Sequence, residues 1–172
     1  NVPIAATDIE GLAYWAEEQK IDLTVVGPEA PLAAGLVDAL TVRGLKAFGP
    51  TREAAAIEGS KVFSKNLMQK YGIPTADYAV FTEPAKAKAY IRQQAMPLVL
   101  KADGLAAGKG VLIAQNQNEA LKAVEDILEV GAFGAAGNRL VIEEFLEGEE
   151  VTVLAFCDGE HVLPMASSQD HK

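Results

Sequence analysis

The chain has 172 residues, of which 49% are hydrophobic and 23% charged, and its formal net charge at pH 7 is −9. This composition is typical of a globular protein, and the length allows one large core or two small lobes. The acidic balance argues against nucleic acid as a partner, because such binding needs clustered lysine and arginine. No apolar run could cross a bilayer and no basic leader opens the chain, so we expect a cytoplasmic protein without a membrane partner.

The first elements are predicted to be a helix and a strand. Thr7 and Glu10 have the spacing of a capping box, and apolar residues then recur at helical spacing, which predicts a helix to about Gln19. Residues 22–26 are short, β-branched and followed by Gly-Pro, which is typical of a strand.

The same order then repeats. A second helix is predicted from Pro31 to Gly44, and residues 46–48 form a strand that also ends at Gly-Pro. This alternation predicts the later part of a doubly wound α/β domain with a parallel sheet, in which ligands bind at the carboxyl ends of the strands. Glu29 would lie at that edge; the alternative is a solvated carboxylate near a helix start.

The rest of the chain changes character. Apolar residues between 63 and 71 mark a helix that ends at Gly72, and another helix opens at Pro84. From 98 to 165 the order is strand, glycine loop, strand, helix, Gly-Ala loop and two strands, which predicts a small α+β lobe. The single cysteine, Cys157, follows an apolar run, so we interpret it as a packed thiol.

A glycine-rich loop joins the two apolar runs between 98 and 114. It carries three glycines and two lysines, namely Lys101, Gly104, Gly108, Lys109 and Gly110. Glycines let the backbone approach a ligand, and lysines supply charge for phosphate oxygens. The segment is not a P-loop, because Asp103 and Gly110 stand where that motif needs a glycine and a hydroxyl, and a strand follows instead of a helix. We predict a lid for nucleotide phosphates; the alternative is an ordinary hairpin connection.

Lys101 also lies at the end of the apolar run 98–100. A lysine in that position must reach solvent or find an anionic partner, and we expect an anionic ligand to be that partner.

Four features follow one another along the chain: Gly59-Ser60-Lys61 at a helix start, Lys101, the glycine loop, and the acidic segment 141–150. Together they resemble the ATP-grasp ligases, in which ATP lies between two α+β lobes. The resemblance implies that Lys61 and Lys101 hold phosphates and that Glu150 accepts the ribose hydroxyls. It also implies an adenine hinge made of Glu143, Glu144, Phe145 and Leu146. A solvated acidic hairpin is the alternative for these glutamates.

The resemblance extends to a narrower family. The segments that carry it are 27–32, 48–51, 58–61, 101–110 and 168–172. They resemble the phosphoribosylamine–glycine ligase family of purine biosynthesis, over nearly the whole chain. This implies that ATP and Mg²⁺ activate glycine as an acyl phosphate, which 5-phosphoribosylamine then attacks. It also implies that the substrates are contacted by Glu29, Asp170, His171 and Lys172. An exposed loop imidazole is the plain alternative for His171.

The same resemblance divides the chain into four segments. Residues 1–60 would be the C-terminal part of the N-terminal α/β domain, 61–97 a connecting ATP-grasp segment, 98–166 the ATP-grasp lid subdomain, and 167–172 the start of the catalytic C-terminal lobe. The metal ligands would follow Lys172, so none is assigned within the sequence. Since the sequence begins with Asn1 and stops in a polar run, we expect a fragment. The resemblance implies that the first glycine-rich strand-turn of the family would precede Asn1 and the metal ligands would follow Lys172, so we expect the fragment to be inactive alone. We also expect the parent protein to be a monomer.

Two other functions remain open. An ATP-grasp ligase with another acid or amine substrate would share the ATP-binding half, and a non-catalytic nucleotide-binding module would bind without turnover. A dehydrogenase would need a fingerprint glycine run at the first strand-to-helix turn, and these residues contain none.

Overall fold

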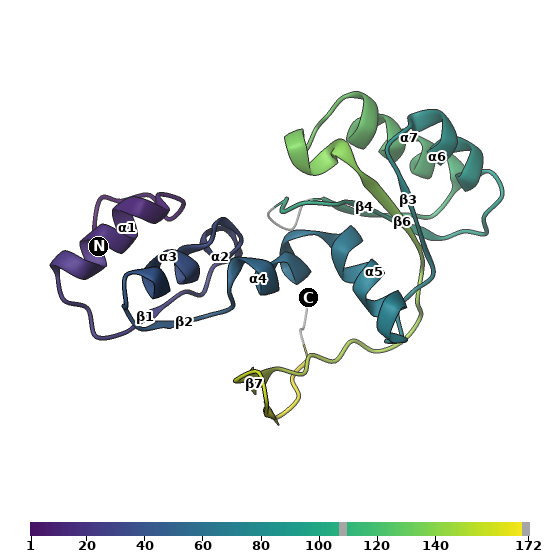
Figure 1. The fold of residues 1–172 in the computed structure, drawn as a ribbon. Coiled ribbons are helices and arrows are strands. Elements are labelled where there is room, and N and C mark those ends of the chain that lie inside the picture. The colour runs from purple at the N-terminus through teal and green to yellow at the C-terminus, as the bar shows by residue number, and fades with distance from the viewer. Residues whose placement is uncertain (107–109, 170–172) are drawn as a thin grey trace.

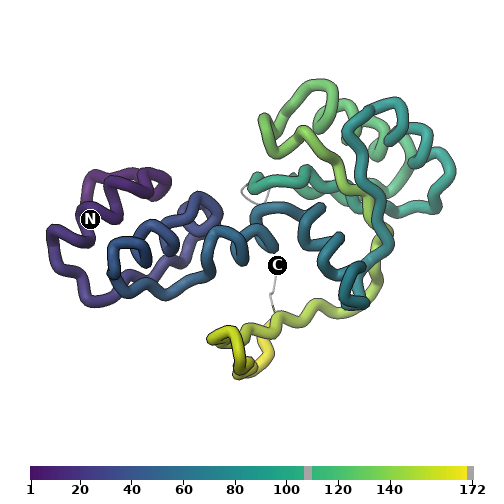
Figure 2. The backbone as a smooth tube through the Cα atoms, viewed as in Figure 1, coloured from purple at the N-terminus to yellow at the C-terminus, as the bar shows by residue number. Residues whose placement is uncertain are grey.

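The computed structural model describes residues 1–106 and 110–169 (Figure 1). The chain starts with α1 (Ile9–Glu18), β1 (Thr24–Val25), α2 (Glu29–Ala34), α3 (Leu36–Val42) and β2 (Ala47–Phe48). Next come α4 (Arg52–Gly59) and α5 (Lys61–Tyr71). A second unit contains β3 (Tyr78–Phe81), α6 (Pro84–Ile91), β4 (Leu98–Ala102), β5 (Val111–Ala114), α7 (Gln117–Val124) and β6 (Leu140–Glu144). The hairpin of β7 (Ala155–Cys157) and β8 (Val162–Pro164) follows. The tube in Figure 2 shows α4 linking the N-terminal unit to the rest.

The N-terminal unit follows the predicted order with two differences in its helices. α1 is capped by Asp8, whose Oδ1 accepts from the Gly11 N–H at 3.0 Å, so the expected capping box at Thr7 is wrong. The second predicted helix is two helices, because Gly35 adopts φ +94°, a left-handed conformation that ends α2 before α3 begins. β1 and β2 pair in parallel, as the alternation predicts.

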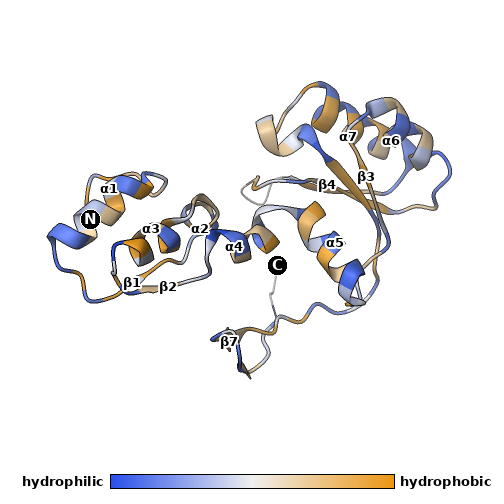
Figure 3. Ribbon diagram, viewed as in Figure 1, coloured by the Kyte–Doolittle hydropathy of each residue, from blue (hydrophilic) through white to orange (hydrophobic). Residues whose placement is uncertain are grey.

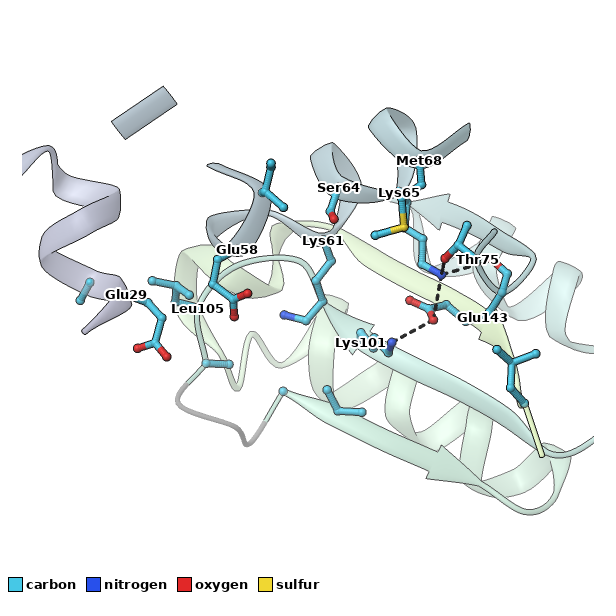
Figure 4. A pocket seen from close by; sticks show the side chains of 17 residues that line it. Glu29, Glu58, Lys61, Ser64, Lys65, Met68, Thr75, Lys101, Leu105 and Glu143 are labelled. Carbon is cyan, nitrogen blue, oxygen red and sulfur yellow. Dashed lines mark hydrogen bonds and ion pairs between the residues drawn. The ribbon is translucent and has the colours of Figure 1, made fainter. Parts of the chain in front are cut away.

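The second unit is a four-stranded antiparallel sheet in the order β3-β6-β4-β5. The predicted hairpin on either side of the glycine loop is therefore confirmed as β4 and β5. Figure 3 shows much of the ribbon at the centre of this sheet in the hydrophobic colour. Alternate residues of its strands, including Leu100 and Ile142, form a core with α6 and α7. The intervening residues, including Lys101 and Glu143, face the other way, toward α5 (Figure 4).

α5 is the helix predicted to start at Gly59-Ser60-Lys61 and to end at Gly72. Ser60 caps it by accepting from the Phe63 N–H at 3.1 Å, and Gly72 ends it in the left-handed conformation. The helix before it, α4, was not predicted; Thr51 caps it by accepting from the Ala54 N–H at 3.3 Å. The Ser60 hydroxyl and the Lys61 N–H both donate to Asp103, so the start of α5 lies beside the end of β4.

The segment 145–169 lies on the outside of the described protein. Cys157 is exposed, so its interpretation as a packed thiol is wrong. The apolar residues around it lie on a two-stranded hairpin, and no third strand or helix covers this hairpin within the described ranges. Phe156 of the hairpin packs on Phe48, with ring centroids 6.4 Å apart. None of the helices in those ranges is long and apolar enough to cross a membrane.

Candidate functional site

A cleft of about 860 Å³ separates α2, α4 and α5 from the sheet (Figure 4). Its walls come from α2, α4, α5, β4, β5 and β6 and from the segments that follow α5, β4 and β6. The charged and polar lining residues are Glu29, Glu58, Lys61, Ser64, Lys65, Thr75, Lys101 and Glu143, and apolar ones include Met68, Leu105, Val111 and Leu146. This volume lies within the usual range for small-molecule sites, roughly 300–1,000 Å³. The cleft thus combines an apolar wall with a cluster of lysines.

Lys101 enters the cleft from β4. Strand alternation turns its neighbours Leu100 and Ala102 into the core and leaves the Lys101 side chain on the opposite face. Its Nζ lies 2.8 Å from Glu143 Oε2, and 26% of the side chain is exposed. Lys101 therefore has the anionic partner that its position requires, but that partner is a side chain of the protein and not the ligand expected from the sequence.

Lys61 enters the same cleft as the first residue of α5. Its backbone N–H donates to Asp103 O, and its Nζ donates to Gly104 O, both at 3.1 Å. Burial lowers the pKa of Lys61 below its ordinary value; the carboxylate of Asp103 opposes this shift, and the positive charge of Lys101 adds to it. The structure thus brings together the two lysines that the sequence singled out.

Asp103 joins the two elements that carry these lysines. Its buried carboxylate accepts from the Val62 N–H at 2.7 Å and the Ser60 hydroxyl at 3.0 Å, and it pairs with Arg139 at 2.5 Å. The turn after β4 is therefore tied to the first turn of α5. In the sequence, Asp103 stands out only as a departure from the P-loop pattern, and its place directly after a buried strand is the one signal of this role.

Only a glycine fits at position 104 of the same turn, because Ala136 lies too close for a side chain. A Cβ atom at Gly104 would lie 2.9 Å from Ala136 Cβ, and the Gly104 N–H donates to Ala136 O at 3.3 Å. Further along the loop, Gly110 lines the cleft. The backbone at Gly104 is thus held against the 3₁₀ turn Gly134–Asn138.

Glu143 is not part of a solvated acidic hairpin. Its side chain is 5% exposed, and its Oε2 forms ion pairs with both Lys65 Nζ, at 3.1 Å, and Lys101 Nζ. Its Oε1 is buried and has no hydrogen-bond partner among the described residues. The resemblance implied a role for Glu143 only as part of the adenine hinge. Lys65 was not predicted at all, because a lysine one helical turn from Lys61 gives no signal of burial.

The remaining residues of the expected adenine hinge take different places. Glu144 is tied to the sheet edge: its N–H donates to Asp77 O at 3.0 Å, and its carboxylate accepts from the Asp77 N–H at 2.9 Å. Leu146 lines the cleft, whereas Phe145 does not. Glu150 is exposed and is not among the lining residues.

The predicted substrate-side residues are only partly described. Glu29, at the start of α2, lines the cleft opposite the lysines (Figure 4). Asp170, His171 and Lys172 lie outside the described residues, as do Gly108 and Lys109 of the glycine loop.

The fold and the cleft first define a class of protein. The structure of phosphoribosylamine–glycine ligase from Thermotoga maritima matches with a TM-score of 0.71 and 34% identity, over 83% of this chain and 34% of that chain. N5-carboxyaminoimidazole ribonucleotide synthetase from Thermus thermophilus matches with a TM-score of 0.72 and 22% identity, over 98% of this chain and 43% of that chain. The chain has the fold of both enzymes, and the family model that matches residues 59–172 describes an ATP-grasp domain.

Within this class, the chain belongs to the phosphoribosylglycinamide synthetase family. Sequence models of the family match its N domain to residues 1–58 and its ATP-grasp domain to residues 59–172. The phosphoribosylamine–glycine ligases of Escherichia coli K12 and Salmonella typhimurium LT2 are each 58% identical over all 172 residues. The resemblance inferred from the sequence is confirmed. The chain spans 40% of the length of these relatives.

Proposed function

We propose that the protein containing this chain joins glycine to 5-phosphoribosylamine, with ATP converted to ADP and phosphate and glycinamide ribonucleotide as the product. Membership of the family along the whole chain supports this assignment. The observation that carries it is the convergence of Lys61 and Lys101, from separate elements, on one cleft with an apolar wall. Such a cleft suits a nucleotide, which has an apolar base and a charged phosphate chain.

The proposed chemistry needs no nucleophilic side chain. A carboxylate oxygen of glycine attacks the γ-phosphorus of ATP, and ADP leaves. The amine of phosphoribosylamine then attacks the carbonyl carbon of the acyl phosphate, loses a proton and expels phosphate. Lys61 and Lys101 bind and orient the phosphate oxygens as charge redistributes, and the cleft keeps water from the acyl phosphate.

The nucleotide is proposed to lie along the sheet edge. Its adenine would contact backbone groups of the segment 143–146 beside Leu146, and its ribose would bind Glu150. The backbone at Gly104, Gly108 and Gly110, together with Lys109, would approach the phosphates. A strand edge supplies one donor and one acceptor, and a carboxylate accepts from a diol. Glycine and phosphoribosylamine would be contacted by Glu29, Asp170, His171 and Lys172.

Mg²⁺ accompanies ATP in this proposal and would screen the phosphate charge when bound. The described residues contain no group of three histidines, cysteines or acidic residues that could hold a metal ion. No step is therefore assigned to the metal.

The same proposal covers the finer domain organisation. Residues 1–60 would belong to a doubly wound domain, 61–97 would connect it to the ATP-grasp lid subdomain of 98–166, and 167–172 would begin the catalytic lobe. The position of β4 and β5 along one wall of the cleft supports the assignment of a lid.

ADP release by the full-length protein tests the proposed function. With ATP, Mg²⁺, glycine and phosphoribosylamine present, we expect ADP to form, and omission of glycine or of the amine should each abolish it. ADP formation that ignores glycine but requires another carboxylic acid would contradict the assignment while keeping a ligase. Nucleotide binding without turnover under any of these conditions would leave only a binding module.

The lowered pKa of Lys61 predicts a pH dependence of nucleotide binding. Between that pKa and the ordinary value of 10.5, Lys61 is neutral although exposed lysines keep their protons. Nucleotide affinity should therefore fall as the pH rises through the Lys61 pKa, and binding in this window should take up a proton, since phosphate charge raises the pKa again. Titration calorimetry in two buffers with different ionisation enthalpies measures that uptake.

Lys61→Arg provides the control for this prediction, because arginine stays charged throughout the window. The variant should bind without proton uptake. Equal uptake by the variant and the wild type would assign the effect to another group.

A further inference from the structure

Lys65 is a buried lysine whose role the proposed chemistry does not explain. It lies on α5 one turn after Lys61, and its side chain is only 9% exposed. Its Nζ has three acceptors: Thr75 Oγ1 at 2.8 Å, Ala76 O at 3.2 Å and Glu143 Oε2 at 3.1 Å. An ammonium group has three protons to donate. Lys65 therefore has no donor left for a ligand and is held in place.

Lys101 shares Glu143 with Lys65 but is less constrained. Among the described residues, Glu143 Oε2 is the one acceptor of its Nζ, and its side chain is more exposed than that of Lys65. Figure 4 shows Lys65 and Lys101 approaching the same carboxylate from opposite sides. Lys101 can therefore offer protons to an anion in the cleft, whereas Lys65 cannot.

The difference in free donors between Lys65 and Lys101 matters because both lysines pair with the buried carboxylate of Glu143. A carboxylate as buried as this one is strongly disfavoured when it has no cationic partner. If Lys101 were its sole partner, each contact between Lys101 and a phosphate would weaken the pairing of Glu143. Because Lys65 stays in place, Glu143 remains paired, and its negative charge is offset where the phosphates would bind.

We propose that Lys65 is a positioning residue, the resident counter-ion of Glu143, which leaves Lys101 available to bind the phosphates of a nucleotide. The inference deepens the proposed function and rests on it for the identity of the ligand. It predicts a dependence of one side chain on another: Lys65 matters for nucleotide binding only while Glu143 is charged.

A double-mutant cycle in the full-length protein tests this dependence. The four proteins are the wild type, Lys65→Met, Glu143→Gln and the double variant, and the measurement is ADP affinity by titration calorimetry. Lys65→Met should weaken ADP binding about 10- to 100-fold in the wild-type background, the worth of one charge-assisted contact. In the Glu143→Gln background the same substitution should change the affinity little, because no buried charge then holds Lys101.

Two further variants separate positioning from general damage to α5. Lys65→Arg keeps the cation and should restore most of the affinity lost in Lys65→Met. Lys70→Met removes an exposed lysine from the same helix and should bind ADP like the wild type. The unfolding midpoint of every variant is measured beside its affinity.

The inference is overturned if Lys65→Met binds ADP like the wild type, or if it weakens binding equally in both Glu143 backgrounds. Should Lys65→Met fail to fold, the double variant decides. We expect it to fold, since it removes the buried carboxylate together with its buried partner and leaves only the partly exposed Lys101 without an acceptor. Its failure to fold would make Lys65 purely structural.

Inorganic tripolyphosphate serves as a second probe that contains no adenine. If the wild type binds tripolyphosphate but not ADP, the proposed function fails, while the same cycle read with tripolyphosphate still decides the role of Lys65. If the wild type binds neither, both proposals are overturned.

Discussion

Replacing Lys101 with methionine is expected to lower ADP formation by the full-length protein about 10²- to 10³-fold, the usual loss when one fixed electrostatic contact to a transferring group is removed. Lys101 lies in the cleft with most of its donor capacity unused among the described residues. Methionine preserves much of its length and apolar stem. Because Glu143 keeps Lys65 as its partner, the variant should remain folded. Steady-state ADP release with saturating glycine and amine measures the loss.

Lys122→Met is the matched control for Lys101→Met. Lys122 is an exposed lysine on α7 that pairs with Asp126 and is not among the residues that line the cleft. Its removal should leave turnover unchanged. Equal rates for Lys101→Met and Lys122→Met would show that Lys101 does not bind the phosphates during turnover.

Replacing Asp103 with alanine is expected to produce the largest loss of stability, about 2–4 kcal/mol in the free energy of unfolding. The substitution leaves the Val62 N–H and the Ser60 hydroxyl without their acceptor and separates Arg139 from its carboxylate. The turn after β4 then keeps only the two bonds that Lys61 donates to the backbone oxygens of Asp103 and Gly104. Urea unfolding of the full-length protein, followed by circular dichroism, measures this change.

Nucleotide affinity should fall together with stability in Asp103→Ala, because the same ties set the positions of Lys61 and Lys101. Asp103→Asn should retain part of both, since an amide oxygen can still accept from Val62. Asp126→Ala, which breaks the exposed ion pair with Lys122 of α7, should change stability by less than about 1 kcal/mol. A stable Asp103→Ala protein with normal ADP affinity would contradict the proposed role of this tie.

Local patterns predicted the parts of the site that lie on one element. The apolar runs around the glycine loop predicted β4 and β5, and the caps of α5 followed from Ser60 and Gly72. Helix breaks were harder to predict, because Gly35 stands inside an unbroken apolar pattern and its left-handed backbone is a property of the fold.

Contacts between distant segments could not be predicted in this way. Lys101 and Glu143 meet only because β6 inserts between β3 and β4 in one particular register, which pairs Lys101 with Val141. Lys65 then reaches the same carboxylate from a helix on the other side of the cleft. Cys157 shows the opposite error: an apolar run was taken as a sign of burial, but the strand that carries it is exposed.

The transfer of a labelled oxygen tests the central claim most directly. Glycine labelled with ¹⁸O in its carboxylate is given to the full-length protein with ATP, Mg²⁺ and phosphoribosylamine, and the released inorganic phosphate is analysed by mass spectrometry. If the cleft forms glycyl phosphate, one labelled oxygen of each glycine consumed must appear in phosphate. ADP formation with unlabelled phosphate would contradict the account, because the glycine carboxylate would then never have been the acceptor of the phosphoryl group.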